Sequence, residues 1–338
     1  MTEDSFVNKL ELHYFFNDFD KTHSMDAVVR NKCEHELLQI IGTISKELNI
    51  HIKVETEAYD QGGLKELYTF LCTVEGQTII LLSNLAVTAL GIIISSIPLK
   101  KTRLDKLEQN LCIEEKKLNI EVQKLNLVLI KKELKEKKIE TTNINIEKLD
   151  YIITNNIKIL KHKSNFYKAL TNYPKVNRLS TAGLYEDKKR IAEPKIIERK
   201  DFEKFILDSD ILEPIQDDNA TIEIISPVLK KGKYKWRGIY NKVSQPIEFS
   251  MRDKEFKDGI IERGTTFKSG TFLDCIIEIS RKIDDLGNVF NNNYVVVTVL
   301  RQHEEGIITE TSKGKKIRQK REAEKSQFRL FDDTKKHE

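Results

Sequence analysis

The sequence predicts an α+β protein that consists of a small N-terminal β-α-β unit, one transmembrane helix, a helical coiled-coil hairpin stalk and a C-terminal antiparallel α+β domain. Three features predict this order: strand and helix periodicities before residue 58, an uncharged apolar run at 78–97, and leucines at heptad spacing after residue 99. The composition of 39% hydrophobic and 33% charged residues is too polar for a multi-span transporter, so we expect most of the chain to lie in water.

The N-terminal unit, residues 1–75, is predicted from alternating and helical patterns. Residues 10–16 and 50–57 have the alternation of strands, and residues 25–48 have the apolar spacing of an amphipathic helix. We interpret the short amphipathic stretch 64–74 as a segment that lies at a membrane surface. Because the N-terminus is acidic and polar, we expect no cleaved secretion signal.

The transmembrane helix is predicted within residues 76–99. The run 78–97 contains no charged residue, and at about 1.5 Å per residue its length matches the roughly 30 Å hydrocarbon core of a bilayer. Pro98 ends the run, and basic residues follow within 100–106, as is typical of a cytoplasmic boundary. These features predict a single-pass protein of the bacterial inner membrane with a cytoplasmic C-terminal domain. The side of residues 1–75 stays open, and the alternative for the run is a buried core helix or central strand.

Within this run, four small or polar residues fall on one helical stripe because they are spaced by four, three and four positions: Asn84, Thr88, Gly91 and Ser95. Such a face lets helices approach closely in lipid, or it lines water in an oligomeric pore. We therefore predict that these residues form a pore or helix-packing face. In the alternative interpretation, the hydroxyl groups bond back to the backbone of their own helix.

Residues 100–170 are predicted to form the helical stalk. One apolar seam runs from 104 to 129, and a second series recurs every seven residues from 113 to 134, so the first helix is apolar on two sides. A second amphipathic helix follows, with apolar residues from 146 to 160. A helical hairpin that also oligomerises would shield both faces, so we expect a homo-oligomer of more than two subunits.

The remaining chain divides into a linker, a domain and a tail. Residues 171–195 contain two prolines and a glycine without a sustained period, which is typical of a linker. Residues 196–311 contain five strand-like segments and a short helix near 253–260, which predict the antiparallel α+β domain. The five segments are 221–229, 233–240, 246–251, 271–281 and 293–301. Residues 312–338 are polar and rich in lysine and arginine, and we expect a basic disordered tail.

No catalytic or metal-binding motif is recognisable, so we expect neither an enzyme nor a cofactor nor a metal. Phosphate-binding glycine loops and nucleophile motifs are missing, and the four cysteines lie singly, without a CxxC pair. The group His23, Asp26, Cys33, Glu34 and His35 contains metal-ligand residue types. Its position at the start of a helix favours a structural cap and a solvated helix face instead.

The segment from Lys230 to Tyr240 interleaves basic and aromatic side chains. Cations bind phosphates, and aromatic rings stack on bases at about 1–3 kcal/mol each, so such a strand can hold a nucleotide or a single-stranded oligonucleotide. The predicted ligand-binding residues are Lys233, Tyr234, Lys235, Trp236 and Arg237. In the alternative interpretation, strand alternation places the aromatic residues in the core and the basic residues in solvent.

Two stretches carry a resemblance to a known family: HSMDAVVRNKCEHELL at 23–38 and VETEAYDQGGLKEL at 54–67, followed by the apolar run. They are similar to the N-terminal region of uncharacterised bacterial membrane proteins encoded near defence systems. The layout of the chain resembles the channel-forming effector of the Hailong antiphage system. This resemblance implies an oligomeric membrane effector that is held shut by a nucleic-acid-like ligand, made by a partner nucleotidyltransferase, and that opens when the ligand is lost.

Two functions follow from these observations. The first is a ligand-gated channel or membrane-disrupting protein of bacterial antiphage defence, in which the C-terminal part binds a nucleotide or an oligonucleotide. The second is a membrane-anchored scaffold or adaptor that binds protein partners through its C-terminal domain.

Overall fold

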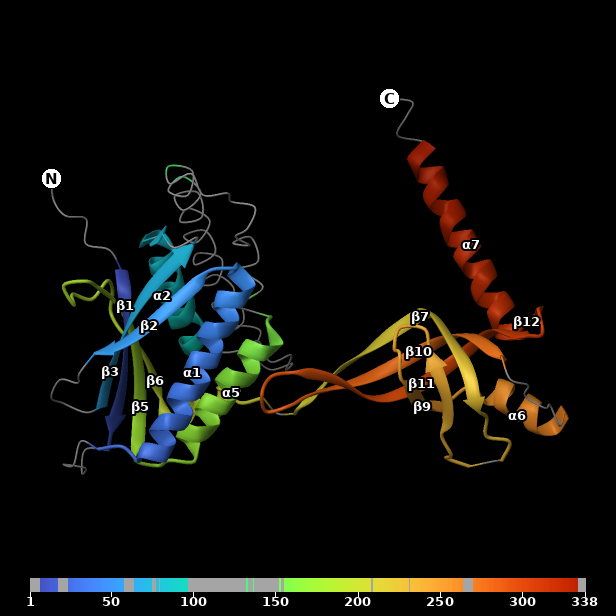
Figure 1. Ribbon diagram of the computed structural model, residues 1–338, viewed down its shortest axis with the longest axis horizontal. Coiled ribbons are helices and arrows are strands. Elements are labelled where there is room, and N and C mark those ends of the chain that lie inside the picture. Colours follow the sequence, from blue (N-terminus) through green and yellow to red (C-terminus); the bar gives the residue numbers. More distant parts are fainter. Residues whose placement is uncertain are drawn as a thin grey trace. The chain divides into compact units, whose positions relative to one another are not determined.

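The chain divides into two compact units, each with its own sheet and its own core (Figure 1). Unit 1 comprises residues 1–208 with 285–288, and unit 2 comprises residues 209–284 with 289–338. The structure, a computed structural model, describes residues 7–17, 24–57, 64–74, 77–78, 80–96, 155–207, 209–230, 232–263 and 270–333, together with residues 132, 136 and 152.

Unit 1 contains an antiparallel sheet with the strand order β2-β3-β1-β5-β6, and the short strand β4 pairs with β3. Its strands are β1 (Val7–Phe16), β2 (His51–Glu57), β3 (Leu64–Val74), β4 (Gln77–Thr78), β5 (Val176–Tyr185) and β6 (Lys195–Glu198). The strands predicted at 10–16 and 50–57 correspond to β1 and β2. They are not neighbours, however, because β3 lies between them and pairs with both. The predicted β-α-β unit is therefore part of a larger sheet.

The stretch 64–74, predicted to lie at a membrane surface, forms β3 inside the sheet. Alternate residues from Glu66 to Cys72 are buried, and the residues between them are less buried. A period of two is that of a strand with one face on a core. The prediction of a segment at a membrane surface is wrong, because these apolar residues belong to a strand that pairs with β1 on one side and β2 on the other.

Helices α1 (Ala27–Leu48) and α5 (Ile157–Thr171) pack side by side in unit 1. The Asp26 carboxylate caps α1, since it accepts bonds from the backbone amides of Val28 at 2.8 Å and Val29 at 3.1 Å. This agrees with the structural cap expected at this helix entrance. Asn49, in the left-handed conformation, ends α1. The short 3-10 helix η3 (Arg199–Phe205) adds Phe202 to the same core.

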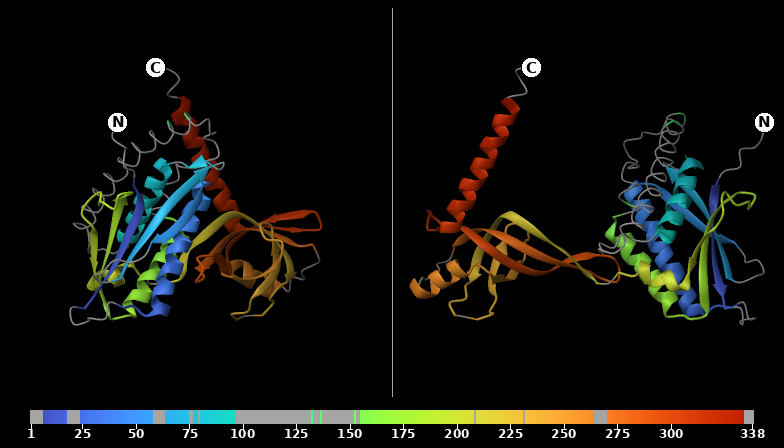
Figure 2. Two further views of the ribbon diagram at one scale, coloured as in Figure 1. Left: turned by 60° about the vertical axis from the view of Figure 1, so that its left-hand side comes forward. Right: turned by 180° about the vertical axis from the view of Figure 1, so that it is seen from behind.

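The apolar run forms helix α2 (Ile80–Ser95), which packs against β1, β3 and β5. Figure 2 shows α2 on the same side of the sheet as α1 and α5. Leu82, Leu90 and Ile94 of α2 are buried in the core of unit 1. Among the described residues, no helix is long and apolar enough to span a membrane. The predicted transmembrane helix is wrong, because a helix enclosed by a sheet and by other helices has the same all-round apolar composition as one enclosed by lipid.

The four residues predicted to form a pore or helix-packing face lie on the less buried side of α2. Thr88 Oγ1 donates to the carbonyl oxygen of Asn84 at 2.8 Å, and Ser95 Oγ donates to that of Gly91 at 2.6 Å. Both hydroxyl groups thus bond back to the backbone of their own helix, as the alternative interpretation has it. The stripe is the weakly buried side of a core helix.

Most of the predicted stalk, including the seam 104–129, lies outside the described residues. The end of its second helix is α5, which belongs to the core of unit 1. Ile157 and Leu160, from the predicted apolar series, are only partly buried. The buried apolar side chains of α5 are Ile159, Phe166, Tyr167 and Leu170.

Residues 171–195, predicted as a linker, contain β5, which pairs with β1 on one side and β6 on the other. Pro174 lies just before β5 and Pro194 just before β6, so neither proline interrupts a strand. Prolines at strand ends cost no ladder hydrogen bonds, so their presence is compatible with a central strand.

Unit 2 contains a second sheet with the strand order β10-β7-β8-β9-β11-β12, in which β10 also pairs with β11. Its elements are β7 (Ile211–Ser226), β8 (Trp236–Tyr240), β9 (Pro246–Met251), α6 (Lys254–Arg263), β10 (Phe272–Ile283), β11 (Val289–Glu304), β12 (Ile307–Glu310) and α7 (Ser312–Asp333). The five strands predicted in the C-terminal domain correspond to β7 to β11.

The strands of unit 2 form a closed barrel. Strands β7, β8 and β9 make a meander and β10 returns beside β7, which is a Greek key. Strand β11 closes the sheet, since it pairs antiparallel with β10 and parallel with β9. A five-stranded Greek-key barrel is the architecture of the OB fold. The domain is thus α+β as predicted, with one parallel pair that the sequence did not indicate.

Residues 312–333 form helix α7, in place of the predicted disordered tail, and α7 extends away from the barrel (Figure 1). Thr311 begins the helix, because its Oγ1 accepts a bond from the Gly314 amide at 2.9 Å and donates to the Val299 carbonyl at 2.6 Å. An ideal Cβ on Gly314 would lie 2.2 Å from the Leu300 carbonyl oxygen. The helix therefore packs onto β11 at a position where only glycine fits.

Candidate nucleic-acid interface

The predicted ligand-binding residues lie at the β7–β8 loop and at the start of β8. Trp236 is fully buried in the barrel core, where its ring lies 6.1 Å from that of Phe249. Tyr234, two residues earlier, is 54% exposed. Strand alternation begins only at residue 236, so the core-and-solvent interpretation holds for Trp236 but not for Tyr234. Trp236 is therefore a core residue, and Tyr234 is the aromatic side chain that a ligand can reach.

The β7–β8 loop is held in place near Tyr234. Lys257 Nζ of α6 donates to the carbonyl oxygen of Gly232 at 2.8 Å. Gly232 has φ +142°, and an ideal Cβ there would lie 2.7 Å from Cε2 of Tyr234. The absence of a side chain at Gly232 thus lets the tyrosine ring lie across the loop backbone. The Tyr234 ring thus has a defined position and is still exposed to solvent.

The outward side of β8 and β9 continues from this loop. Arg237 and Ile239 of β8 point outward, opposite Glu248 and Pro246 of β9 respectively. Gly238, between them, allows close strand approach, since an ideal Cβ would lie 2.5 Å from the Glu223 carbonyl oxygen. We call the exposed surface of the loop and these two strands the β8–β9 face. Its residues are Lys233, Tyr234, Lys235, Arg237, Ile239, Pro246 and Glu248.

The three basic residues of the β8–β9 face are exposed. Within the described part of the chain, Lys233, Lys235 and Arg237 make no ion pair. By contrast, Lys242 near the end of β8 binds Asp217 at 2.8 Å, and Arg252 after β9 binds Glu278 at 3.0 Å. As far as the described residues go, these three cations can bind phosphates without first breaking a salt bridge.

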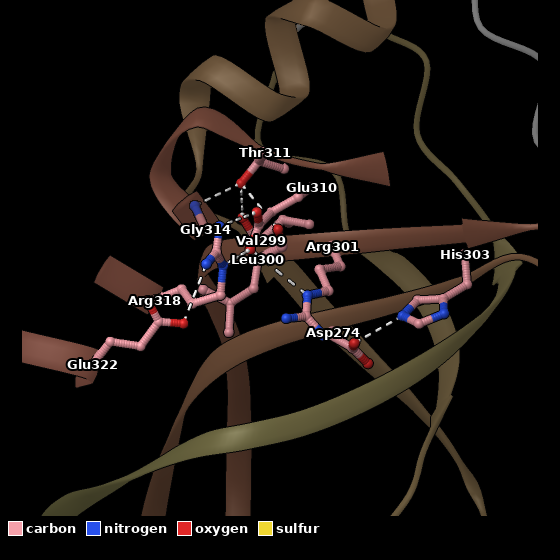
Figure 3. Close-up of polar contacts among 10 residues, drawn as sticks. All are labelled: Asp274, Val299, Leu300, Arg301, His303, Glu310, Thr311, Gly314, Arg318 and Glu322. Carbon is pink, nitrogen blue, oxygen red and sulfur yellow. Dashed lines mark hydrogen bonds and ion pairs between the residues drawn. The ribbon is translucent and has the colours of Figure 1, made fainter. Parts of the chain in front are cut away.

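A second polar cluster lies where α7 meets β10, β11 and β12 (Figure 3). Glu310 binds Arg318 at 3.1 Å and Arg301 at 3.8 Å, and a hollow of about 420 Å³ lies beside them. The hydrogen bond from Arg318 holds the pKa of the Glu310 carboxyl below its usual value. Because the arginines already have carboxylate partners, this cluster joins α7 to the barrel and does not offer a free anion site. Sequence reasoning missed it, since its residues come from four separate elements.

The same cluster holds a His303–Asp274–Thr221 arrangement that is not a nucleophile triad. His303 Nε2 lies 2.7 Å from one oxygen of Asp274, and Thr221 Oγ1 donates to the other at 3.0 Å. A nucleophile must bond to the base itself, whereas here the carboxylate lies between the hydroxyl and the imidazole. The geometry does not activate Thr221.

Three buried thiols in the described ranges have raised pKa values, those of Cys33, Cys72 and Cys275. Burial raises the pKa of Cys72 to about 11 and that of Cys275 to about 12, because a thiolate is poorly solvated in an apolar core. These thiols are protonated at neutral pH and are therefore poor nucleophiles. Within the described ranges, no three His, Cys, Asp or Glu residues are grouped to hold a metal ion.

Comparisons with family models, with curated proteins and with solved structures found no match to this chain. The resemblance to the Hailong effector therefore stays a prediction, as do the nucleotidyltransferase partner and the oligomer that it implies. The strand pairing alone defines the barrel topology.

Proposed function

We propose that unit 2 binds a single-stranded nucleic acid through the β8–β9 face. The observation that carries this proposal is the exposed Tyr234 ring, positioned between two exposed lysines that have no carboxylate partner among the described residues. An aromatic ring stacks on any base at about 1–3 kcal/mol, and neighbouring cations bind the backbone. Stacking needs unpaired bases, so the proposed ligand is single-stranded.

The barrel architecture supports this assignment. In OB folds, the face of the second and third strands and the loop between the first and second strands bind oligonucleotides. In unit 2 these parts are β8, β9 and the β7–β8 loop, where Tyr234 and Arg237 lie. The location of the exposed residues and the topology of the barrel thus favour the same surface.

Fluorescence anisotropy of the full chain with a labelled single strand of about 15 nucleotides tests the proposal, because one OB fold covers about 4–16 nucleotides. We expect Tyr234→Ala to weaken binding about tenfold through the loss of one stacking contact. The double variant Lys233→Ala/Lys235→Ala should reduce the steepness of log K against log salt by about 1.4, since two phosphate contacts are lost. Lys168→Ala/Lys200→Ala makes the same charge change on exposed residues of unit 1 and serves as the matched control.

An affinity that is unchanged in Tyr234→Ala, or a salt dependence that is reduced equally in the control, would overturn the proposal. The fluorescence of Trp236, the single tryptophan of the chain, reports whether each variant keeps the barrel core. Substitution of Trp236 itself is not a test of binding, because the loss of a buried aromatic side chain costs about 3–5 kcal/mol of stability.

A further inference from the structure

Lys257 of α6 contacts the β7–β8 loop, although it lies outside the β8–β9 face as defined above. Its Nζ donates a hydrogen bond to the carbonyl oxygen of Gly232 at 2.8 Å. Gly232 precedes Tyr234 by two residues, and an ideal Cβ on Gly232 would lie 2.7 Å from Cε2 of the tyrosine ring. The ammonium group of Lys257 and the ring of Tyr234 thus contact the same residue of the loop.

The backbone of Lys257 is held in place, because the first turns of α6 are attached to the barrel. The Lys257 amide donates to the carbonyl oxygen of Asp253 at 3.0 Å. Phe256, the preceding residue, packs against the core of unit 2, and Ile260, three residues later, is buried in that core. A side chain on an element that is fixed by packing holds its partners more precisely than one on a loop. The Lys257 side chain therefore reaches the loop from a fixed helix.

The β7–β8 loop, residues 227–235, has few other attachments. Among its described residues between Val228 and Tyr234, no hydrogen bond other than the one from Lys257 is formed. Val228, at the start of the loop, packs partly against the barrel core. A mobile loop must be ordered when a base stacks on its ring, and this ordering reduces the affinity for the ligand. A contact that orders the loop beforehand removes part of that loss.

We infer that Lys257 is a positioning residue for Tyr234: it orders the β7–β8 loop before a strand binds and so raises the affinity for single strands. This inference rests on the proposed binding of single strands by the β8–β9 face. The competing role is a direct contact between the Lys257 ammonium and a phosphate. Such a contact would act independently of Tyr234 and would contribute to the salt dependence of binding, whereas a positioning residue does neither.

A double-mutant cycle on the full chain, measured by anisotropy with a labelled oligothymidylate of about 15 nucleotides, tests the inference. We expect Lys257→Met to weaken binding about threefold, without a change in the slope of log K against log salt. Lys257→Arg keeps a donor for the Gly232 carbonyl and should retain most of the affinity. When Tyr234 is already alanine, Lys257→Met should change the affinity by less than about 1.5-fold. Lys254→Met, an equal charge change at an exposed position of α6, is the matched control and should have as small an effect.

An unchanged affinity in Lys257→Met would overturn the positioning role. A loss that is equally large with and without the tyrosine ring would overturn it too, and a salt slope reduced by about 0.7 would assign Lys257 to a phosphate instead. Each of these results leaves the proposed function standing as long as Tyr234→Ala itself weakens binding. If the unaltered protein does not bind the strand, the proposed function has failed, and this inference fails with it.

Discussion

Lys313 Nζ lies 2.5 Å from Oδ1 of Asp253, so one salt bridge joins the first turn of α7 to the residue that precedes α6. The Asp253 side chain is only 2% exposed. Its Oδ2 accepts a bond from the backbone amide of Val299 in β11 at 3.0 Å, and its Oδ1 accepts one from the Phe256 amide at 3.4 Å. A single buried carboxylate thus connects α6 and α7 to the barrel.

We expect Asp253→Ala to destabilise unit 2 by about 2–4 kcal/mol, because it leaves two backbone amides and one ammonium group without their acceptor. Lys313→Met should cost less, about 1–2 kcal/mol, since the lysine side chain is 40% exposed and water screens part of the interaction. Urea unfolding followed by Trp236 fluorescence measures both. Lys316→Met, at an exposed position of the same helix, should change stability by less than about 0.5 kcal/mol. Equal stabilities for Asp253→Ala and the unaltered chain would contradict the role of this carboxylate.

Two helical glycines should respond in opposite ways to alanine. Gly314→Ala places Cβ within 2.2 Å of the Leu300 carbonyl oxygen, and we expect it to destabilise unit 2 by about 1–3 kcal/mol as α7 moves away from β11. At Gly42 of α1, no described atom beyond the adjoining helix backbone lies within 4 Å of an ideal Cβ. Gly42→Ala should therefore stabilise α1 by about 0.5–1 kcal/mol, because alanine has the higher helix propensity. Trp236 fluorescence reports the first change and far-ultraviolet circular dichroism the second. A stabilising Gly314→Ala would show that α7 does not pack on β11.

The buried thiol of Cys275 should make unit 2 less stable at alkaline pH. Its pKa is raised to about 12 by burial, while a thiol in the unfolded chain titrates near about 8.5. The folded state therefore holds the proton of Cys275 more tightly than the unfolded chain does. The stability that this proton contributes is complete below about pH 8.5 and is lost as the pH rises toward 12, by at most about 1.4 kcal/mol per pH unit. Between pH 8 and pH 10, the unaltered chain should lose about 1–2 kcal/mol more than Cys275→Ala in urea unfolding. The same loss in both proteins would assign the effect to other groups.

The sequence by itself determined the local elements that have a clear period. Strands β1 and β2, helix α1 and the five barrel strands all follow from alternation or helical spacing, because these patterns report which side of an element is shielded from water. The sequence also showed where the basic and aromatic residues around Tyr234 are concentrated. A cap at the entrance of α1 was expected for the same reason, since capping depends on neighbouring residues alone, and the structure identifies the capping residue as Asp26.

The tertiary structure decided which groups cover the apolar side chains. The run that forms α2 is apolar on all sides, and only the sheet of unit 1 shows that protein and not lipid covers it. Tyr234 and Trp236 have equivalent positions in the pattern, yet the strand begins between them, so one is exposed and the other is buried. Closure of the barrel, in which β10 pairs with β7 and β11 pairs with β9, depends on strands that are distant in sequence. The periodicity of the sequence reports which residues are shielded from water. Which element shields them depends on contacts between residues that are remote in sequence.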